Sequence, residues 1–151
     1  MSIETMKRRI VAFADKDVGN AASLEDLPNY ELTFGVKIPE SYRAFLMNVG
    51  WARFAHEQLF GLGGSIPKYL DLADRTYDER YEARTYMPYD LVPIMNDGAG
   101  NHYCLQTAKL ANGECPVVFW DHELGEDQVP EFVSRSFDEW LIELLDALEL
   151  Q

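Results

Sequence analysis

Apolar residues recur every three or four positions in five stretches of this chain, which is the spacing of one face of an α-helix. The first stretch covers residues 3–13, and the last covers residues 137–148. Three shorter stretches lie between them, at residues 27–34, 39–49 and 65–77. The pattern therefore predicts five helices, each with an apolar face directed toward a core.

Residues that begin or end helices flank several of these stretches. Gly35 and Gly50 follow the second and third, and glycine readily adopts the left-handed conformation that ends a helix. Ser136 and Glu139 form a capping-box pattern before the last stretch, in which each side chain accepts a hydrogen bond from a backbone N–H. In the fourth stretch, the predicted apolar face carries Tyr69, Leu70, Ala73 and Tyr77, and the acidic face carries Asp71, Asp74, Asp78 and Glu79.

The period becomes that of strands after residue 91. Four short strands are predicted in all, at residues 58–62, 91–95, 102–106 and 116–120. Turn residues, including Asn112-Gly113, separate the last three into a meander. Helices that precede the strands, rather than alternate with them, favour an α+β fold. We therefore expect a single domain over residues 1–151, with a largely antiparallel sheet packed against helices.

The composition describes a folded and strongly acidic chain. It has 151 residues, 47% of them hydrophobic, and 13 basic against 26 acidic residues give a net charge of −13. Nucleic acid is not expected as a partner, because binding it requires Lys and Arg to neutralise phosphates. A basic protein is a better candidate, since a negative field accelerates its capture. The alternative is that the charge only maintains solubility.

The amino-terminal segment carries no readable targeting signal. Residues 1–14 include Glu4, Lys7, Arg8 and Arg9, so they lack the long apolar run of a signal peptide or a membrane span. We therefore expect a cytoplasmic protein with no membrane contact. Cys104 and Cys115 do not form a CxxC pair, and we expect both to remain reduced in that compartment.

The loop at residues 97–101, Asp-Gly-Ala-Gly-Asn, contains the glycines of a phosphate-binding loop. It has neither the Lys-Ser/Thr ending of a P-loop nor the spacing of a dinucleotide fingerprint. It also joins two predicted strands, so no helix N-terminus is available to a phosphate. We interpret it as a hairpin in which Asp97 and Asn101 bond nearby backbone groups.

Side chains of the types that bind metals lie near the predicted strand ends: Asp97, His102, Asp121, His122 and Glu123. Such a group can hold a divalent cation, but the HxH and HExxH spacings are absent. An ordinary polar patch is the favoured interpretation, and no metal or cofactor is expected. No serine lies in a nucleophile-elbow context, and Cys104 falls in the middle of a strand. We therefore do not expect an enzyme.

Trp51 is the aromatic residue predicted to be exposed. It follows the helix-ending Gly50 and precedes a mixed segment that contains Arg53, His56 and Glu57. An exposed tryptophan in such a segment can anchor a protein interface. Trp51 is therefore a candidate apolar contact for a partner.

The order of several motifs resembles the SUKH superfamily, which includes bacterial immunity proteins and fungal cell-wall regulators. The resemblance spans roughly residues 24–145, and the chain departs from it at Trp51-Ala52, where many members have a second Asn-Gly-Gly-like turn. The motifs that carry the resemblance are IPESYRAFL at residues 38–46, LVPI at 91–94, DGAGNHYCL at 97–105, GECPVVFWDHE at 113–123 and SFDEWL at 136–141.

The resemblance implies a non-enzymatic α+β domain. Bacterial members act as immunity proteins, each of which binds and neutralises a cognate polymorphic toxin, and many such toxins are nucleases with basic grooves. We expect an immunity protein whose acidic surface occludes a basic toxin. The alternative is a regulatory scaffold for endogenous signalling or cell-wall proteins. The predicted contact residues are Trp51, Asp97, Asn101, Asp121, His122, Glu123, Glu126 and Asp127.

Overall fold

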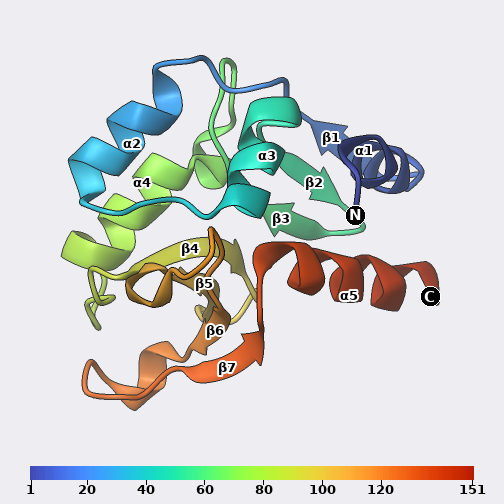
Figure 1. The fold of residues 1–151 in the computed structure, drawn as a ribbon. Coiled ribbons are helices and arrows are strands. Elements are labelled where there is room, and N and C mark those ends of the chain that lie inside the picture. Colours follow the sequence, from blue (N-terminus) through green and yellow to red (C-terminus); the bar gives the residue numbers. More distant parts are fainter.

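Seven strands form one antiparallel sheet in the computed structural model, which describes residues 1–151 (Figure 1). Strands that are adjacent in the sequence are also neighbours in the sheet, so the sheet is a meander. The predicted α+β fold with a largely antiparallel sheet is confirmed. The strands are β1 (Lys16–Val18), β2 (Ala52–Phe54), β3 (Glu57–Leu59), β4 (Leu91–Asn96), β5 (His102–Gln106), β6 (Val117–Trp120) and β7 (Glu131–Ser134).

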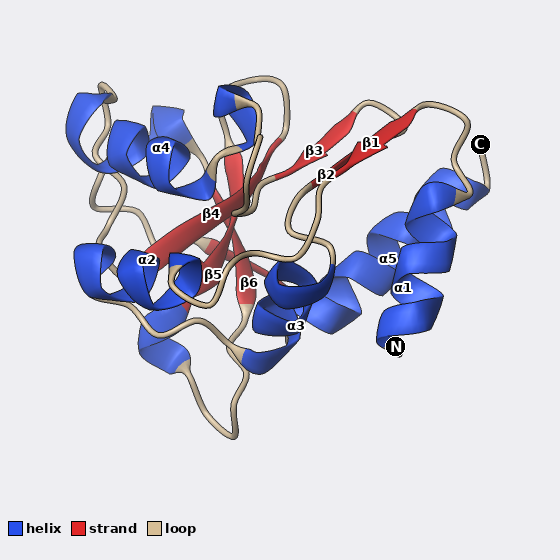
Figure 2. Cartoon of the chain, turned by 90° about the horizontal axis from the view of Figure 1, so that it is seen from above, coloured by secondary structure: helices blue, strands red, loops and turns tan.

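The helices form two groups around this sheet. Three of them, α2, α3 and α4, lie together along one side, whereas α1 and α5 lie side by side near both chain termini (Figures 1 and 2). None of the helices is both long and apolar enough to cross a membrane. The α-helices are α1 (Ile3–Val11), α2 (Asp26–Phe34), α3 (Glu40–Asn48), α4 (Leu72–Tyr77) and α5 (Phe137–Glu149).

The predicted helix ends follow local backbone chemistry. Gly35 ends α2 with a φ of 68°, as its position predicted. The hydroxyl of Ser136 accepts a hydrogen bond from the N–H of Glu139 at 3.1 Å and caps α5. The carboxylate of Glu139 accepts from the N–H of Arg135 at 3.0 Å, one residue before the N–H that the capping-box pattern predicts.

The segment around α4 is not the continuous helix that the spacing predicted. A 3₁₀ turn (Lys68–Leu70) is followed by Asp71, whose ψ of 112° interrupts the helix and whose carboxylate caps α4. Because of this break, the side chains of α4 point in other directions than they would in a helix continuous with the 3₁₀ turn. Tyr69 and Tyr77, predicted on the apolar face, are therefore exposed, whereas Leu70 and Leu72 are fully buried.

Three of the seven strands have no signal in the sequence. β1 and β2 have three residues each, which is too short to show alternation, and β7 has four. The predicted strand at 58–62 is realised as β3, which is shifted toward the amino terminus. The strands predicted at 91–95, 102–106 and 116–120 match β4, β5 and β6 closely.

The sheet separates two buried clusters because successive side chains on a strand point to opposite faces. In β5, Leu105 belongs to the large cluster that packs against the helices, and Cys104 belongs to a smaller one. The large cluster includes Tyr42, Phe45 and Phe137, whose rings contact each other. The small cluster contains Met87, Leu91, Cys104, Val118 and Trp120. The central strands are thus buried on both faces, and the loops at their ends remain at the surface.

Candidate functional site

The β4–β5 loop is held by the side chain of Asp97. One carboxylate oxygen accepts from the N–H of Ala99 at 2.8 Å and of Asn101 at 3.1 Å, and the other accepts from the Asn101 amide at 2.9 Å. Gly98 and Gly100 adopt φ angles of 88° and 90°. Partial burial raises the pKa of Asp97, but these hydrogen bonds outweigh it and hold the pKa below its usual value. The predicted hairpin is confirmed, with an ionised carboxylate at its centre.

Asn101 joins this loop to the next one through hydrogen bonds with His122. Its side-chain oxygen accepts from the backbone N–H of His122 at 3.2 Å and lies 2.7 Å from the ring Nδ1. The same oxygen cannot donate, so Nδ1 carries the proton in this contact. The ring also lies against Gly100, where an added Cβ would be 3.0 Å from Cε1. The two loops therefore form one connected surface.

The β6–β7 loop begins with a 3₁₀ turn, η4 (His122–Leu124), capped by Asp121. The carboxylate of Asp121 accepts from the N–H of Glu123 at 2.9 Å. The Gln128 amide closes the loop by donating to the carbonyl of Asp121 at 2.6 Å and of Gly125 at 2.9 Å. The Asp121 carboxylate thus caps the turn and the neutral Gln128 amide closes the loop, whereas Glu123, Glu126 and Asp127 are exposed.

We call residues 97–101 and 121–131 the acidic loops. They contain six carboxylates and neither Lys nor Arg. No ion pair links any of these carboxylates to a Lys or Arg elsewhere; the only contact is that of Glu123 with His122, at 4.0 Å. The negative charge of this surface is therefore uncompensated within the molecule.

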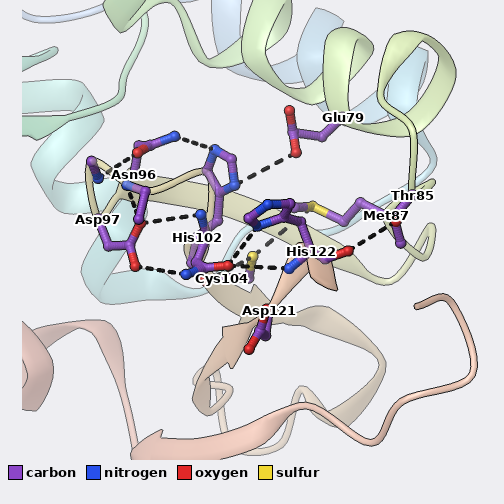
Figure 3. A network of polar contacts seen from close by, with 12 residues as sticks. Glu79, Thr85, Met87, Asn96, Asp97, His102, Cys104, Asp121 and His122 are labelled. Atoms are coloured by element: carbon purple, nitrogen blue, oxygen red, sulfur yellow. Dashed lines mark hydrogen bonds and ion pairs between the residues drawn. The ribbon is translucent and has the colours of Figure 1, made fainter. Parts of the chain in front are cut away.

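His102 lies buried beneath the loops, and Glu79 beside it is partly buried. The Nδ1 of His102 is 3.6 Å from a Glu79 carboxylate oxygen and has no hydrogen-bond partner, while Nε2 lies 3.3 Å from the Asn96 amide (Figure 3). Burial lowers the pKa of His102 to about 4, and burial raises the pKa of Glu79. His102 is therefore neutral near pH 7 and forms part of the support for the loops.

The predicted exposure of Trp51 is wrong. Only 6% of this residue is exposed, and it belongs to the large buried cluster. Gly50, with a φ of 85°, turns the chain directly into β2, and the indole packs against Gly19, where even a Cβ would come within 2.3 Å. The mixed composition around Trp51 predicted neither β2 nor the contact between Gly19 and the indole. Trp51 cannot serve as an exposed anchor.

The remaining predicted contact residues lie on the acidic loops. Asp97, Asn101 and His122 are joined by hydrogen bonds, and Asp121 begins the turn that contains His122. Glu123, Glu126 and Asp127 are exposed on the same loop as Asp121. The structure thus groups seven of the eight predicted contact residues on two adjacent loops.

Three exposed apolar side chains of this surface were missed. Leu124, Val129 and Phe132 have 67%, 92% and 59% of their surface exposed. Phe132 lies on β7, which the sequence did not reveal as a strand, so its direction could not be inferred. The sequence does contain a signal for two of them. Leu124 and Val129 stand singly among charged and turn residues, and such a segment does not form an apolar face that could pack on the core.

Several side chains are chemically inert in this structure. Burial raises the pKa of the Cys104 thiol well above its usual value and that of Cys115 to about 12, so neither forms a thiolate near pH 7. Both cysteines are free. No group of three or more His, Cys, Asp or Glu side chains has the arrangement that could hold a metal ion.

Comparison with known proteins establishes the family. The model of the SUKH_5 family, described as SMI1-KNR4 cell-wall, matches residues 1–146. The chain belongs to the SUKH family. The chain is also similar to the SPbeta prophage-derived uncharacterized protein YokK of Bacillus subtilis (strain 168), which is 24% identical over 184 residues. That alignment covers 97% of this chain and 88% of the relative.

Proposed function

We propose that this SUKH protein is an immunity protein, without enzymatic activity, that neutralises a cognate toxin by binding it through the acidic loops. The observation that carries the proposal is the uncompensated charge of these loops: six carboxylates with no Lys or Arg partner. Family membership supports it, since the SUKH family includes immunity proteins. A toxin with a basic nucleic-acid-binding groove, such as a nuclease, has the complementary charge.

The apolar part of the proposed interface comes from the β6–β7 loop and from β7, which follows it. Leu124, Val129 and Phe132 are exposed beside Glu123, Glu126 and Asp127. In an interface with a charged rim and buried apolar residues, the charges mainly increase the association rate. The buried apolar residues mainly decrease the dissociation rate. These three side chains take the role that the sequence had assigned to Trp51.

The proposal is tested by capture followed by a growth assay. The tagged full chain is used to isolate partners from the native cell lysate, and each captured protein is then expressed in a test host. A basic protein that stops growth alone, but not when it is expressed with this chain, supports the proposal. Captured proteins that are harmless, or whose binding does not weaken as salt rises from 50 to 500 mM, contradict it.

A second function is favoured by the description of the matching family, which refers to the cell wall. In that case the acidic loops would bind an endogenous signalling or cell-wall protein and regulate it. The same experiment separates the two, because an endogenous partner would be captured from cells that lack any toxin and would not inhibit growth.

A further inference from the structure

A hollow of about 330 Å³ lies between α5 and the face of the sheet formed by β3, β4 and β5. Its apolar floor includes Met95, Tyr103 and Trp140, and its rim carries the carboxylates of Glu57, Asp97 and Glu143. No Lys or Arg lines it. We call it the β3–α5 groove. It continues the surface of the acidic loops, because Asp97 belongs to both.

Strand pairing explains why two of the carboxylates share one face of the sheet. Leu59 of β3 is paired with Met95 of β4 in antiparallel register, so Glu57 is brought toward Asp97, the first residue after β4. Glu57 shares the face of Leu59 because residues two apart on a strand share a face, and Asp97 lines the same hollow as Met95. Tyr103 is paired with Met95 across the β4–β5 bulge and reaches the same face.

Helix spacing supplies the opposite wall. Trp140, Glu143 and Leu144 are three and four positions apart on α5 and therefore project from one side of the helix. The Tyr103 and Trp140 rings have centroids 5.7 Å apart at an interplanar angle of 46°. Each wall thus contributes an aromatic ring and at least one carboxylate to the same hollow.

The charge in the groove is unbalanced. None of the three carboxylates forms an ion pair, and the Glu143 carboxylate accepts only from the Ser134 hydroxyl, at 3.0 Å. Burial raises the pKa of Glu57; burial, and then the nearby charges of Asp97 and Glu57, raise the pKa of Tyr103. The raised pKa of Glu57 reflects its partial burial, and the effect of the two carboxylates on Tyr103 indicates a negative potential beside that ring. A cation that entered would offset it.

We propose that the β3–α5 groove binds an arginine side chain of a basic protein partner. Aromatic faces attract a guanidinium group, and its planar donors can bond two carboxylates at once. The volume is sufficient for one long side chain and lies at the small end of the range for ligand sites. The identity of the partner rests on the proposed function, but the preference of the groove for arginine is a property of this chain alone.

The test is a titration of the full-length protein, followed by amide NMR, with N-acetyl-Gly-Arg-Gly-amide. The matched peptide replaces arginine with citrulline, which has nearly the same shape but no charge. We expect saturable shifts of the Trp140 indole N–H and of the Glu57, Asp97 and Tyr103 amides with the arginine peptide alone. Equal shifts with both peptides, or shifts spread over the whole acidic surface, would overturn the proposal.

A variant of the groove and a matched control test whether the arginine peptide binds in the groove. Glu57→Gln/Glu143→Gln keeps the shape of the rim and is expected to weaken peptide binding about tenfold, from the loss of two nearby charges. Glu4→Gln/Glu82→Gln also removes two carboxylates, both exposed and without hydrogen bonds elsewhere, and is expected to bind as the natural chain does. Equal affinity of the two variants contradicts the groove. Thermal unfolding verifies that both variants are folded.

The captured partner then separates this inference from the proposed function. A toxin that is neutralised equally well by Glu57→Gln/Glu143→Gln leaves the proposed function standing and removes the groove from the interface. Conversely, specific arginine binding in a chain that captures no toxin supports the groove and contradicts immunity.

Discussion

The seam between α1 and α5 and the acidic loops use the same residue types in opposite ways. In the seam, Arg9 donates to Asp146 at 2.6 Å and to both carboxylate oxygens of Glu149 at 2.9 Å, and the amino terminus lies 3.0 Å from Asp138. In the acidic loops, no carboxylate contacts Lys or Arg. In the seam, carboxylates of α5 form ion pairs with Arg9 and the amino terminus. In the acidic loops, the carboxylates have no Lys or Arg partner and are available to bind another molecule.

The difference shows that the net charge of −13 does not reveal which carboxylates are paired and which are not. The acidic loops owe their shape to internal hydrogen bonds: the carboxylates of Asp97 and Asp121 accept from backbone N–H groups, and the side chains of Asn101 and Gln128 join neighbouring segments. Such a scaffold allows charge to accumulate without a compensating cation, at the cost of some repulsion. Four predictions, described from the largest expected effect on stability to the smallest, test this division.

Gly100→Ala should damage the acidic loops most. Alanine at a φ of 90° is strained, and its Cβ would lie 3.0 Å from the His122 ring. We expect a loss of about 2–3 kcal/mol in the free energy of unfolding measured in urea. Gly98→Ala is the control, because its φ of 88° is equally unfavourable but its surroundings are open; about 1 kcal/mol is expected. Equal losses would mean that the His122 contact does not support the loop.

Acidification should test the neutral support beneath the loops. The pKa of His102 is about 4 in the fold, against an ordinary value of 6.5. Between these values the unfolded chain binds a proton and the folded chain does not, so the contribution of His102 to stability falls as pH decreases. We expect it to fall by about 2 kcal/mol between pH 7 and pH 5.

Comparison with the His102→Gln variant separates the pH dependence due to His102 from that due to other titrating groups. The partly buried carboxyls of Glu79 and Glu57 have raised pKa values and act in the opposite direction, since protonation stabilises their folded form. The relevant quantity is therefore the difference between the natural chain and the variant at each pH, obtained from urea unfolding. A difference that does not change between pH 7 and pH 5 would show that His102 titrates normally.

Arg9→Met should weaken the seam by about 1 kcal/mol or less. The variant keeps most of the apolar stem, but removes a guanidinium that contacts two carboxylates, and partly exposed pairs of this kind contribute little each. The control is Arg84→Met, an exposed arginine with no hydrogen bond or ion pair. Chemical unfolding at low and high salt provides the measurement. A loss equal to that of the control would mean that packing alone holds α1 on α5.

Neutralising the β6–β7 loop should leave stability almost unchanged. In Glu123→Gln/Glu126→Gln/Asp127→Asn, three exposed carboxylates without cationic partners are lost, so the free energy of unfolding should change by less than about 0.5 kcal/mol. The association rate with a basic partner should fall at low salt and approach that of the natural chain at high salt. Surface plasmon resonance measures both. A slower association that persists at high salt would assign these side chains a direct contact role instead.

Much of the fold was predictable because its signals are local. Gly35 ends α2 and Ser136 caps α5 through contacts within a few residues, and the alternation in β5 distinguishes its two faces without reference to distant elements. The hairpin of Asp97 followed from turn chemistry in the same way. Where the signal was shorter than one period, as in β1 and β2, the prediction had nothing to use.

The candidate site was only partly predictable. The acidic residues of the two loops were identified from their types and positions, but the hydrogen bond that His122 donates to Asn101 joins residues 21 positions apart in sequence. Trp51 was assigned to the surface because its neighbours are polar, although Gly19 and the core determine its burial. The β3–α5 groove combines strands near residues 57, 97 and 103 with α5, and no local pattern contains all of them.

The sequence by itself therefore determined the helices with a full apolar face, the three central strands, the hairpin at Asp97 and the excess of negative charge. Tertiary structure decided which carboxylates are paired, where Trp51 lies, and which aromatic rings share a hollow with acidic groups. The reason is physical: hydrogen-bonding periodicity and turn preferences act over a few residues. Burial and charge compensation depend on groups that come together only when distant segments pack, as Arg9 does with Glu149.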